Sequence, residues 1–278
     1  MNQRQSYLLQ SRKFIPAVAL ILAFSGLNFA QASTTPTDKA YAKVSFAALD
    51  ALNFSKADAI SIFGGAVKVD SSKAGPITEA GSLGFLSSTT KGLGGNKKVD
   101  PKSVYKSVAS CNTTSARPDL IANGSTYTYT AAGNSYIGML TSAISPAAGD
   151  GALNALSRMS KTSCLFSGVN SGLGKIFAGS KSGLVLGAPT PVNNPNFPTG
   201  TYGLVSKGAG KFNDYTLPVD MYLFLAGKGN IVATYEFIIV SIPSSISGSK
   251  TSVDYSKELA KMENSVIAKI SAASPTSN

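Results

Sequence analysis

Alternating hydrophobic and polar positions predict a β-hairpin near the end of the chain. The runs "VDMYLFLA" (residues 219–226) and "NIVATYEFIIVSI" (residues 230–242) flank Gly227-Lys228-Gly229. Short glycine-bearing connections between β-rich runs are typical of hairpins. The runs are too short and too interrupted to span a bilayer as a helix, so we interpret them as the centre of a soluble sheet.

Each arm of this hairpin presents one regular set of apolar positions. One face of the first arm carries Val219, Met221, Leu223 and Leu225. One face of the second arm carries Ile231, Ala233, Tyr235, Phe237 and Ile239. Glu236 points to the opposite side, and we expect it to reach water or a lysine there.

The next segment predicts an amphipathic helix. Its apolar positions recur at steps of four and three, at Tyr255, Leu259, Met262, Val266 and Ile270. Thr251 and Asp254 have the spacing of a capping box, and the polar side carries Lys257, Glu258, Lys261 and Lys269. A basic amphipathic helix can bind membranes, but the apolar face of the preceding sheet must also be buried. We therefore predict that Leu259, Met262 and Val266 pack over a core of Leu223, Leu225, Phe237 and Ile239.

Residues 51–65 predict a second, shorter helix. Ser55 and Asp58 form a capping-box pattern, Gly64-Gly65 supplies a stop, and Ala57, Ile60 and Phe63 fall near one face. Strands are predicted at "AVKVD" (residues 66–70), "GSTYTYTA" (124–131) and "SCLFSGV" (163–169), with a helix over 150–161. The predicted fold is α+β: a twisted antiparallel sheet packed on one face by helices that include the C-terminal one.

The first 32 residues have the layout of a secretory signal peptide. Basic residues without acidic ones precede an apolar stretch over 14–29, and Ala30-Gln31-Ala32 matches a cleavage site. The alternative is an uncleaved N-terminal anchor. Cleavage leaves residues 33–278 as a single exported domain with frayed ends, secreted or held at the cell envelope.

The mature chain is basic. Of the 25 basic residues, cleavage removes Arg4, Arg12 and Lys13, which leaves 22 against 14 acidic residues and a net charge of +8. Only Arg117 and Arg158 remain as arginines. Dispersed lysines are typical of a solvated surface; the functional alternative is weak attraction to anionic envelope components. No nucleic-acid-binding motif is present, and export argues against that partner.

Cysteine and histidine content narrow the chemistry. Cys111 and Cys164 most simply form one disulfide in an oxidising compartment. The alternative is a redox or metal role, but the chain has no C-x-x-C motif and no histidine. The absence of histidine also excludes His-based triads, and the sequence predicts neither a metal site nor a cofactor.

A candidate binding site combines aromatic and cationic side chains. Tyr127 and Tyr129 fall on one face of the predicted strand 124–131, and Arg117 lies just upstream. The tyrosines are either ordinary sheet residues or the wall of a groove whose lip is the Pro/Asn-rich segment 189–202. Aromatic walls with a few polar groups are common in ligand pockets, and Arg117 would pair with an anionic headgroup.

Four segments together carry a family resemblance. In order they are "LNFSKADAISIFGG", "SCLF", "VDMYLFLAGKGNIVATYEFII" and "KELAKMENSVIAKI". This arrangement resembles that of actinobacterial exported lipoproteins and kinase-sensor extracellular domains. The chain differs from them in lacking a lipobox cysteine, a second disulfide and a kinase. The resemblance implies a PsbP-like α+β fold that binds ligands or wall components rather than catalysing a reaction.

These observations predict a non-catalytic, sensor-like binding protein of the cell envelope, with an apolar or anionic envelope component as its partner. A structural or adhesive surface protein is one alternative. A secreted hydrolase that works without histidine is the other.

Overall fold

The structure, a computed structural model, describes residues 51–65, 67–77, 122–132, 136–146, 170, 182–212, 215–228, 231–243 and 254–273. Two helices and eight strands lie in these ranges: α4 (Lys56–Phe63), β1 (Val67–Ile77), β2 (Ala122–Ala132), β3 (Tyr136–Pro146), β4 (Ser182–Leu186), β5 (Thr190–Val192), β6 (Thr201–Phe212), β7 (Tyr215–Lys228), β8 (Ile231–Ser241) and α10 (Ser256–Ala272).

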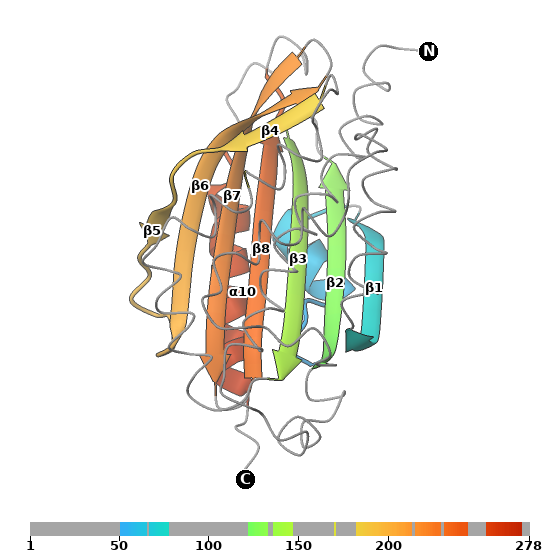
Figure 1. Ribbon diagram of the computed structural model, residues 1–278, viewed down its shortest axis with the longest axis vertical. Helices are drawn as coiled ribbons and strands as arrows, with labels where there is room; N and C mark the ends of the chain where they lie inside the picture. The colour runs from blue at the N-terminus through green and yellow to red at the C-terminus, as the bar shows by residue number, and fades with distance from the viewer. Residues whose placement is uncertain are drawn as a thin grey trace.

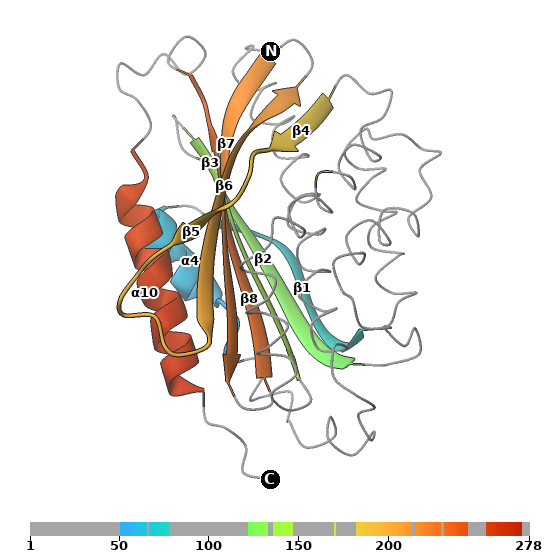
Figure 2. The same cartoon turned by 60° about the vertical axis from the view of Figure 1, so that its left-hand side comes forward.

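The eight strands form one antiparallel sheet in the order β1-β2-β3-β8-β7-β6-β4, and β5 also pairs with β6. The predicted hairpin is present as β7 and β8 at the middle of this sheet (Figure 1). The sheet is strongly twisted, and both helices lie on one of its faces (Figure 2). This arrangement confirms the predicted α+β class.

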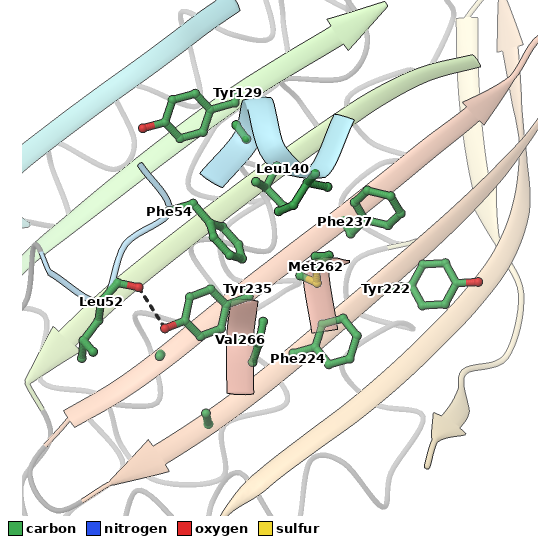
Figure 3. Close-up of a cluster of buried hydrophobic side chains, with 14 of the residues drawn as sticks. Leu52, Phe54, Tyr129, Leu140, Tyr222, Phe224, Tyr235, Phe237, Met262 and Val266 are labelled. Carbon is green, nitrogen blue, oxygen red and sulfur yellow. Dashed lines mark hydrogen bonds between the residues drawn. The ribbon is translucent and has the colours of Figure 1, made fainter. Parts of the chain in front are cut away.

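Strand alternation builds the core beneath the helices. Tyr235, Phe237 and Ile239 of β8 point to the helix-covered face, where α10 contributes Met262, Val266 and Ile270 (Figure 3). All six side chains are buried. Burial of this much apolar surface is the dominant force that holds a helix against a sheet.

Helix α4 begins as the sequence predicts but buries a different face. Ser55 and Asp58 form both hydrogen bonds of the capping box, and Gly64 ends the helix with a φ of 70°. The buried residues are Ala59, Ile62 and Phe63, whereas Ala57 and Ile60 are exposed, so the stripe of Ala57, Ile60 and Phe63 is not the buried face.

Glycine at position 138 accounts for this rotation of α4. A Cβ there would lie 2.2 Å from Phe63 Cε1. The missing side chain lets the Phe63 ring lie directly on β3. That contact turns Ile62 and Ala59 inward as well and leaves Ile60 exposed on the surface.

Helix α10 begins later than the sequence predicts. Its first residue is Ser256, and Tyr255 occupies the N-cap position, so the Thr251–Asp254 capping box is wrong. Instead the Asp254 carboxylate accepts a hydrogen bond from the Ser256 amide at 3.0 Å. The Tyr255 hydroxyl donates to the Asp220 carboxylate of β7. A side chain of the sheet thus anchors the start of this helix.

The two helices also bind each other. Lys269 forms an ion pair with Asp58 at 3.0 Å, and the Lys261 ammonium donates to the Ser61 carbonyl at 2.8 Å. The Lys269 side chain is only 15% exposed, so its predicted place on the wet side of the helix is wrong. Burial opposes ionisation of Asp58, but hydrogen bonds from Ser55 and the Lys269 pair outweigh it and lower the pKa of that carboxyl.

The opposite face of the sheet, which we term the back face, is buried too. Leu223 and Leu225 lie there, so the prediction that they pack beneath α10 is wrong; the residues of β7 under the helices are Tyr222, Phe224 and Ala226. The central strands also place the following buried side chains on the back face: Ile137, Met139, Met221, Ile238 and Val240. The middle of the sheet therefore has two apolar faces.

Several predictions concern residues outside those that the structure describes. These are the signal peptide 1–32, the Cys111–Cys164 disulfide, the helix over 150–161 and the strand over 163–169. In the described part of the chain, no helix combines the length and apolar character needed to cross a bilayer.

Candidate functional site

The predicted tyrosine site is only partly described. Tyr129 is 3% exposed and belongs to the core under the helices, where Figure 3 places it beside Phe54 and Leu140. Tyr127 lies in β2 opposite Ser142 of β3. Arg117 lies outside the described residues. The Tyr129 side chain therefore packs in the hydrophobic core. The roles of Tyr127 and Arg117 in binding stay predictions.

The segment predicted as the lip of that groove lies elsewhere. Asn194 donates to the Glu263 carboxylate of α10 at 2.8 Å, and the Phe197 ring meets Phe224 of β7 edge-on at 5.5 Å. Strands β3, β8 and β7 separate this segment's partner, β6, from β2. At the usual strand spacing that separation is about 20 Å, so the described part of this segment lies away from Tyr129.

A different polar group, the carboxyl of Glu236, lies at the centre of the back face. Its strand is the middle of the sheet, and its neighbours in register are Thr141 of β3 and Leu223 of β7. The side chain is 0% exposed, and neither carboxyl oxygen has a hydrogen-bond partner in the described part of the chain. The expectation that Glu236 reaches water or a lysine is therefore wrong.

Burial controls the protonation of this carboxyl. Removal from water disfavours the ionised form and raises the pKa of Glu236 well above its ordinary value. Among the residues that the structure describes, no cation or hydrogen-bond donor offsets that effect. Burial therefore favours the neutral form of Glu236, a carboxylic acid with one O–H donor and further acceptor capacity.

Thr234 adds a second polar group to the same face. It lies two residues before Glu236 in β8, opposite Leu225. Its hydroxyl oxygen is also buried and has no hydrogen-bond partner among the residues that the structure describes. Successive residues on one face of a strand are about 7 Å apart at their Cα atoms, so the two groups form one polar spot, which we term the Glu236–Thr234 pair.

Other buried polar groups nearby are satisfied, as is usual in proteins. Ser206, buried on the same face, donates to the Gly187 carbonyl at 2.8 Å. On the helix-covered face, the Tyr235 hydroxyl donates to the Leu52 carbonyl at 3.0 Å (Figure 3). Apart from the Glu236–Thr234 pair, the Thr201 hydroxyl is the other buried side-chain group without a partner among the described residues.

The site has no described counter-charge or metal-binding partner. The described buried residues include no lysine or arginine. Among the same described residues, no three Asp, Glu, Cys or His side chains are grouped as metal ligands. The arrangement can therefore offer hydrogen bonds within an apolar environment, and little else.

Sequence reasoning missed this site because it assumed that one face of the hairpin meets solvent. The sequence feature that could have indicated burial of Glu236 is the apolar composition around it. Tyr235 and Phe237 adjoin it, and Ile238, Ile239 and Val240 follow. A carboxyl in a continuous apolar run is more often buried than one in an alternating strand, because strands buried on both faces lose that alternation.

Comparison with known proteins gives a structural likeness and no family. No family model matches the chain, and no curated protein matches it. Among solved structures it is similar to the crystal structure of the extracellular domain of PknH from Mycobacterium tuberculosis, with 11% identity and a TM-score of 0.36, over 80% of this chain and 97% of that one. A likeness at this level establishes neither a shared fold nor a shared function.

Proposed function

We propose that this protein is an exported, non-catalytic binding protein of the cell envelope, and that the Glu236–Thr234 pair takes part in binding. One observation carries the proposal: Glu236 is fully buried, and both of its carboxyl oxygens lack a partner among the described residues. The signal-peptide pattern of residues 1–32 supports export.

The energetic argument concerns what an unpaired group costs. A buried polar group without a hydrogen bond destabilises a protein by about 1–3 kcal/mol. Leucine at position 236 would fill a similar space without that penalty. A ligand that hydrogen-bonds to Glu236 offsets the penalty in the bound state only, so the carboxyl adds affinity at the expense of stability.

The surroundings of Glu236 favour binding over catalysis. A general acid or base works through proton transfer to a positioned partner, and such residues are oriented by hydrogen bonds. Glu236 has no hydrogen bond to orient it. Its strand neighbours in register, Leu223 and Thr141, supply one apolar side chain and one hydroxyl.

A tryptophan reporter tests the location of binding. The chain contains no tryptophan, so Met221→Trp places a single reporter on the back face and Phe224→Trp places one on the helix-covered face. The probe is a long-chain alkanol brominated within a few carbons of its hydroxyl, because bromine quenches tryptophan on contact. We expect saturable quenching of the Met221→Trp protein and little quenching of the Phe224→Trp protein.

Two further variants control for surface adsorption. Val185 and Ile60 are the large apolar side chains that are exposed in the described residues, at 69% and 43%. Val185→Ser combined with Ile60→Ser should leave the quenching of the back-face reporter unchanged. Equal quenching of both reporters, or loss of quenching in the surface variant, would refute the proposed location, provided circular dichroism shows that each protein is folded.

A further inference from the structure

Strand β4 ends one side of the sheet, and β6 is the one described strand that pairs with it. Strands β4 and β5 pair one after the other with β6, so together they form the edge on this side (Figure 1). We infer that the side chain of Asn170 caps this edge and keeps a second copy of the chain from adding to β4. The inference concerns other residues than the Glu236–Thr234 pair and does not depend on the proposed function.

The register of β4 and β6 fixes which backbone groups of β4 point outward. The Gly187 amide, directly after β4, donates to the Lys207 carbonyl of β6 at 2.9 Å. Positions that exchange hydrogen bonds with the neighbouring strand alternate along an antiparallel pair. Val185 therefore directs its backbone groups to β6. The positions whose N–H and C=O point away from β6 are the alternate ones: Ser182, Leu184 and Leu186.

Asn170 occupies the outward groups of Leu186. Its Nδ2 donates to the Leu186 carbonyl at 2.6 Å, and its Oδ1 accepts from the Leu186 amide at 2.9 Å. A residue of an adjacent antiparallel strand would make the same pair of hydrogen bonds through its own carbonyl and amide. The side-chain amide of Asn170 therefore takes the position that a residue of an added strand would take.

The remainder of this edge has features that oppose strand addition in other proteins. Strand β5 is three residues long, and its middle residue, Pro191, has no N–H to offer. The Ser206 hydroxyl donates to the Gly187 carbonyl at 2.8 Å and so holds the connection between β4 and β5 against β6. Asn170 is the contact that closes β4 itself, and a single substitution can remove it.

A second copy of β4 matches the uncapped edge. Two antiparallel β4 strands related by a two-fold axis pair Leu184 with its own equivalent, and such self-complementary contacts are the usual form of a dimer interface. In that register Val185 of one copy lies opposite Gly183 of the other. Val185 is 69% exposed, so pairing would remove apolar surface from water in addition to forming backbone hydrogen bonds.

Disulfide cross-linking in the full chain tests the inference. One preparation carries Asn170→Ala with Gly183→Cys, and the other carries Asn170→Ala with Val185→Cys. A Cβ at Gly183 meets no described atom within 4 Å, and Val185 is exposed, so the fold has room for both cysteines. Opposite residues at such a position are about 4.5 Å apart at their Cα atoms, which suits a disulfide. We expect the mixture to form a linked dimer whose 183–185 junction appears in peptide mass spectrometry.

Two comparisons assign the effect to the cap. The same cysteine pair with Asn170 intact should cross-link at least about tenfold less, because strand addition must first break the two hydrogen bonds to Leu186. Asn194→Ala in place of Asn170→Ala is the matched control. It removes an amide that donates to Glu263 of α10, away from β4, and should leave cross-linking at the low level.

Circular dichroism establishes first that each protein is folded. If Asn170→Ala is not, Asn170→Asp replaces it, because aspartate keeps the shape and loses the donor to the Leu186 carbonyl. Equal cross-linking with and without Asn170 would overturn the cap. A folded variant that gives no 183–185 junction would overturn the second copy as the molecule that the cap excludes.

Discussion

Glu236→Gln is expected to remove a pH dependence of stability that the wild-type protein shows above about pH 4.3, the ordinary pKa of a glutamate side chain. In the folded protein, burial raises the pKa of Glu236, so the carboxyl stays protonated. In the unfolded chain it ionises, which favours unfolding. The wild-type free energy of unfolding should therefore fall by about 1.4 kcal/mol per pH unit, until the pH passes the pKa of the folded state.

The measurement is urea unfolding at a series of pH values for wild type and Glu236→Gln. Asp58 has a lowered pKa in the folded state and loses its contribution as the pH falls, but both proteins share that effect, so it cancels in their difference. Thr234→Val is the matched control, since it removes the other unpaired group without a titration and should keep the wild-type slope. Parallel stability curves for wild type and Glu236→Gln would show that Glu236 is not a buried neutral acid.

Met262→Ala is expected to destabilise the protein by about 2–5 kcal/mol, the usual cost of truncating a fully buried Met or Leu side chain. Met262 is 0% exposed and lies on the side of α10 that packs against the helix-covered face of the sheet (Figure 3). The truncation removes apolar contacts and leaves a cavity between the helix and the sheet. Chemical denaturation with linear extrapolation measures the loss.

Leu259→Ala provides the comparison within the same helix. The sequence alone predicts the full core cost at Leu259, but this residue is only partly buried and packs at the edge of the cluster. Its truncation should therefore cost clearly less than that of Met262. Equal losses at the two positions, or a larger loss at Leu259, would mean that α10 is rotated relative to the orientation described here.

Local patterns in the sequence predicted α4, α10, β7, β8 and parts of β1 and β2, but not β3, β4, β5 or β6. The hairpin followed from two apolar runs around Gly227-Lys228-Gly229, and the capping box at Ser55 fixed the start of α4. The spacing of Met262, Val266 and Ile270 identified the buried side of α10. Each of these signals lies within a few residues of the chain, and none requires knowledge of distant contacts.

Contacts between distant segments determine several features that the sequence alone did not predict. Alternation separates Leu223 from Phe224 but does not say which of them faces the helices, because both faces of β7 are apolar and buried. The orientation of α4 depends on Gly138, 75 positions after Phe63. The start of α10 depends on Asp220 in β7. The burial of Glu236 follows from the same two-sided core.

Difference infrared spectroscopy between wild type and Glu236→Gln at neutral pH tests the central claim most directly, because the carbonyl stretch of a protonated carboxyl is separate from that of a carboxylate. A protonated-carboxyl band should appear in the wild-type protein alone. Saturating amounts of the long-chain alkanol should shift it to lower frequency as the Glu236 carbonyl accepts a hydrogen bond. A missing band, or a band that saturating alkanol leaves in place, would contradict a neutral Glu236 that holds the polar end of the ligand.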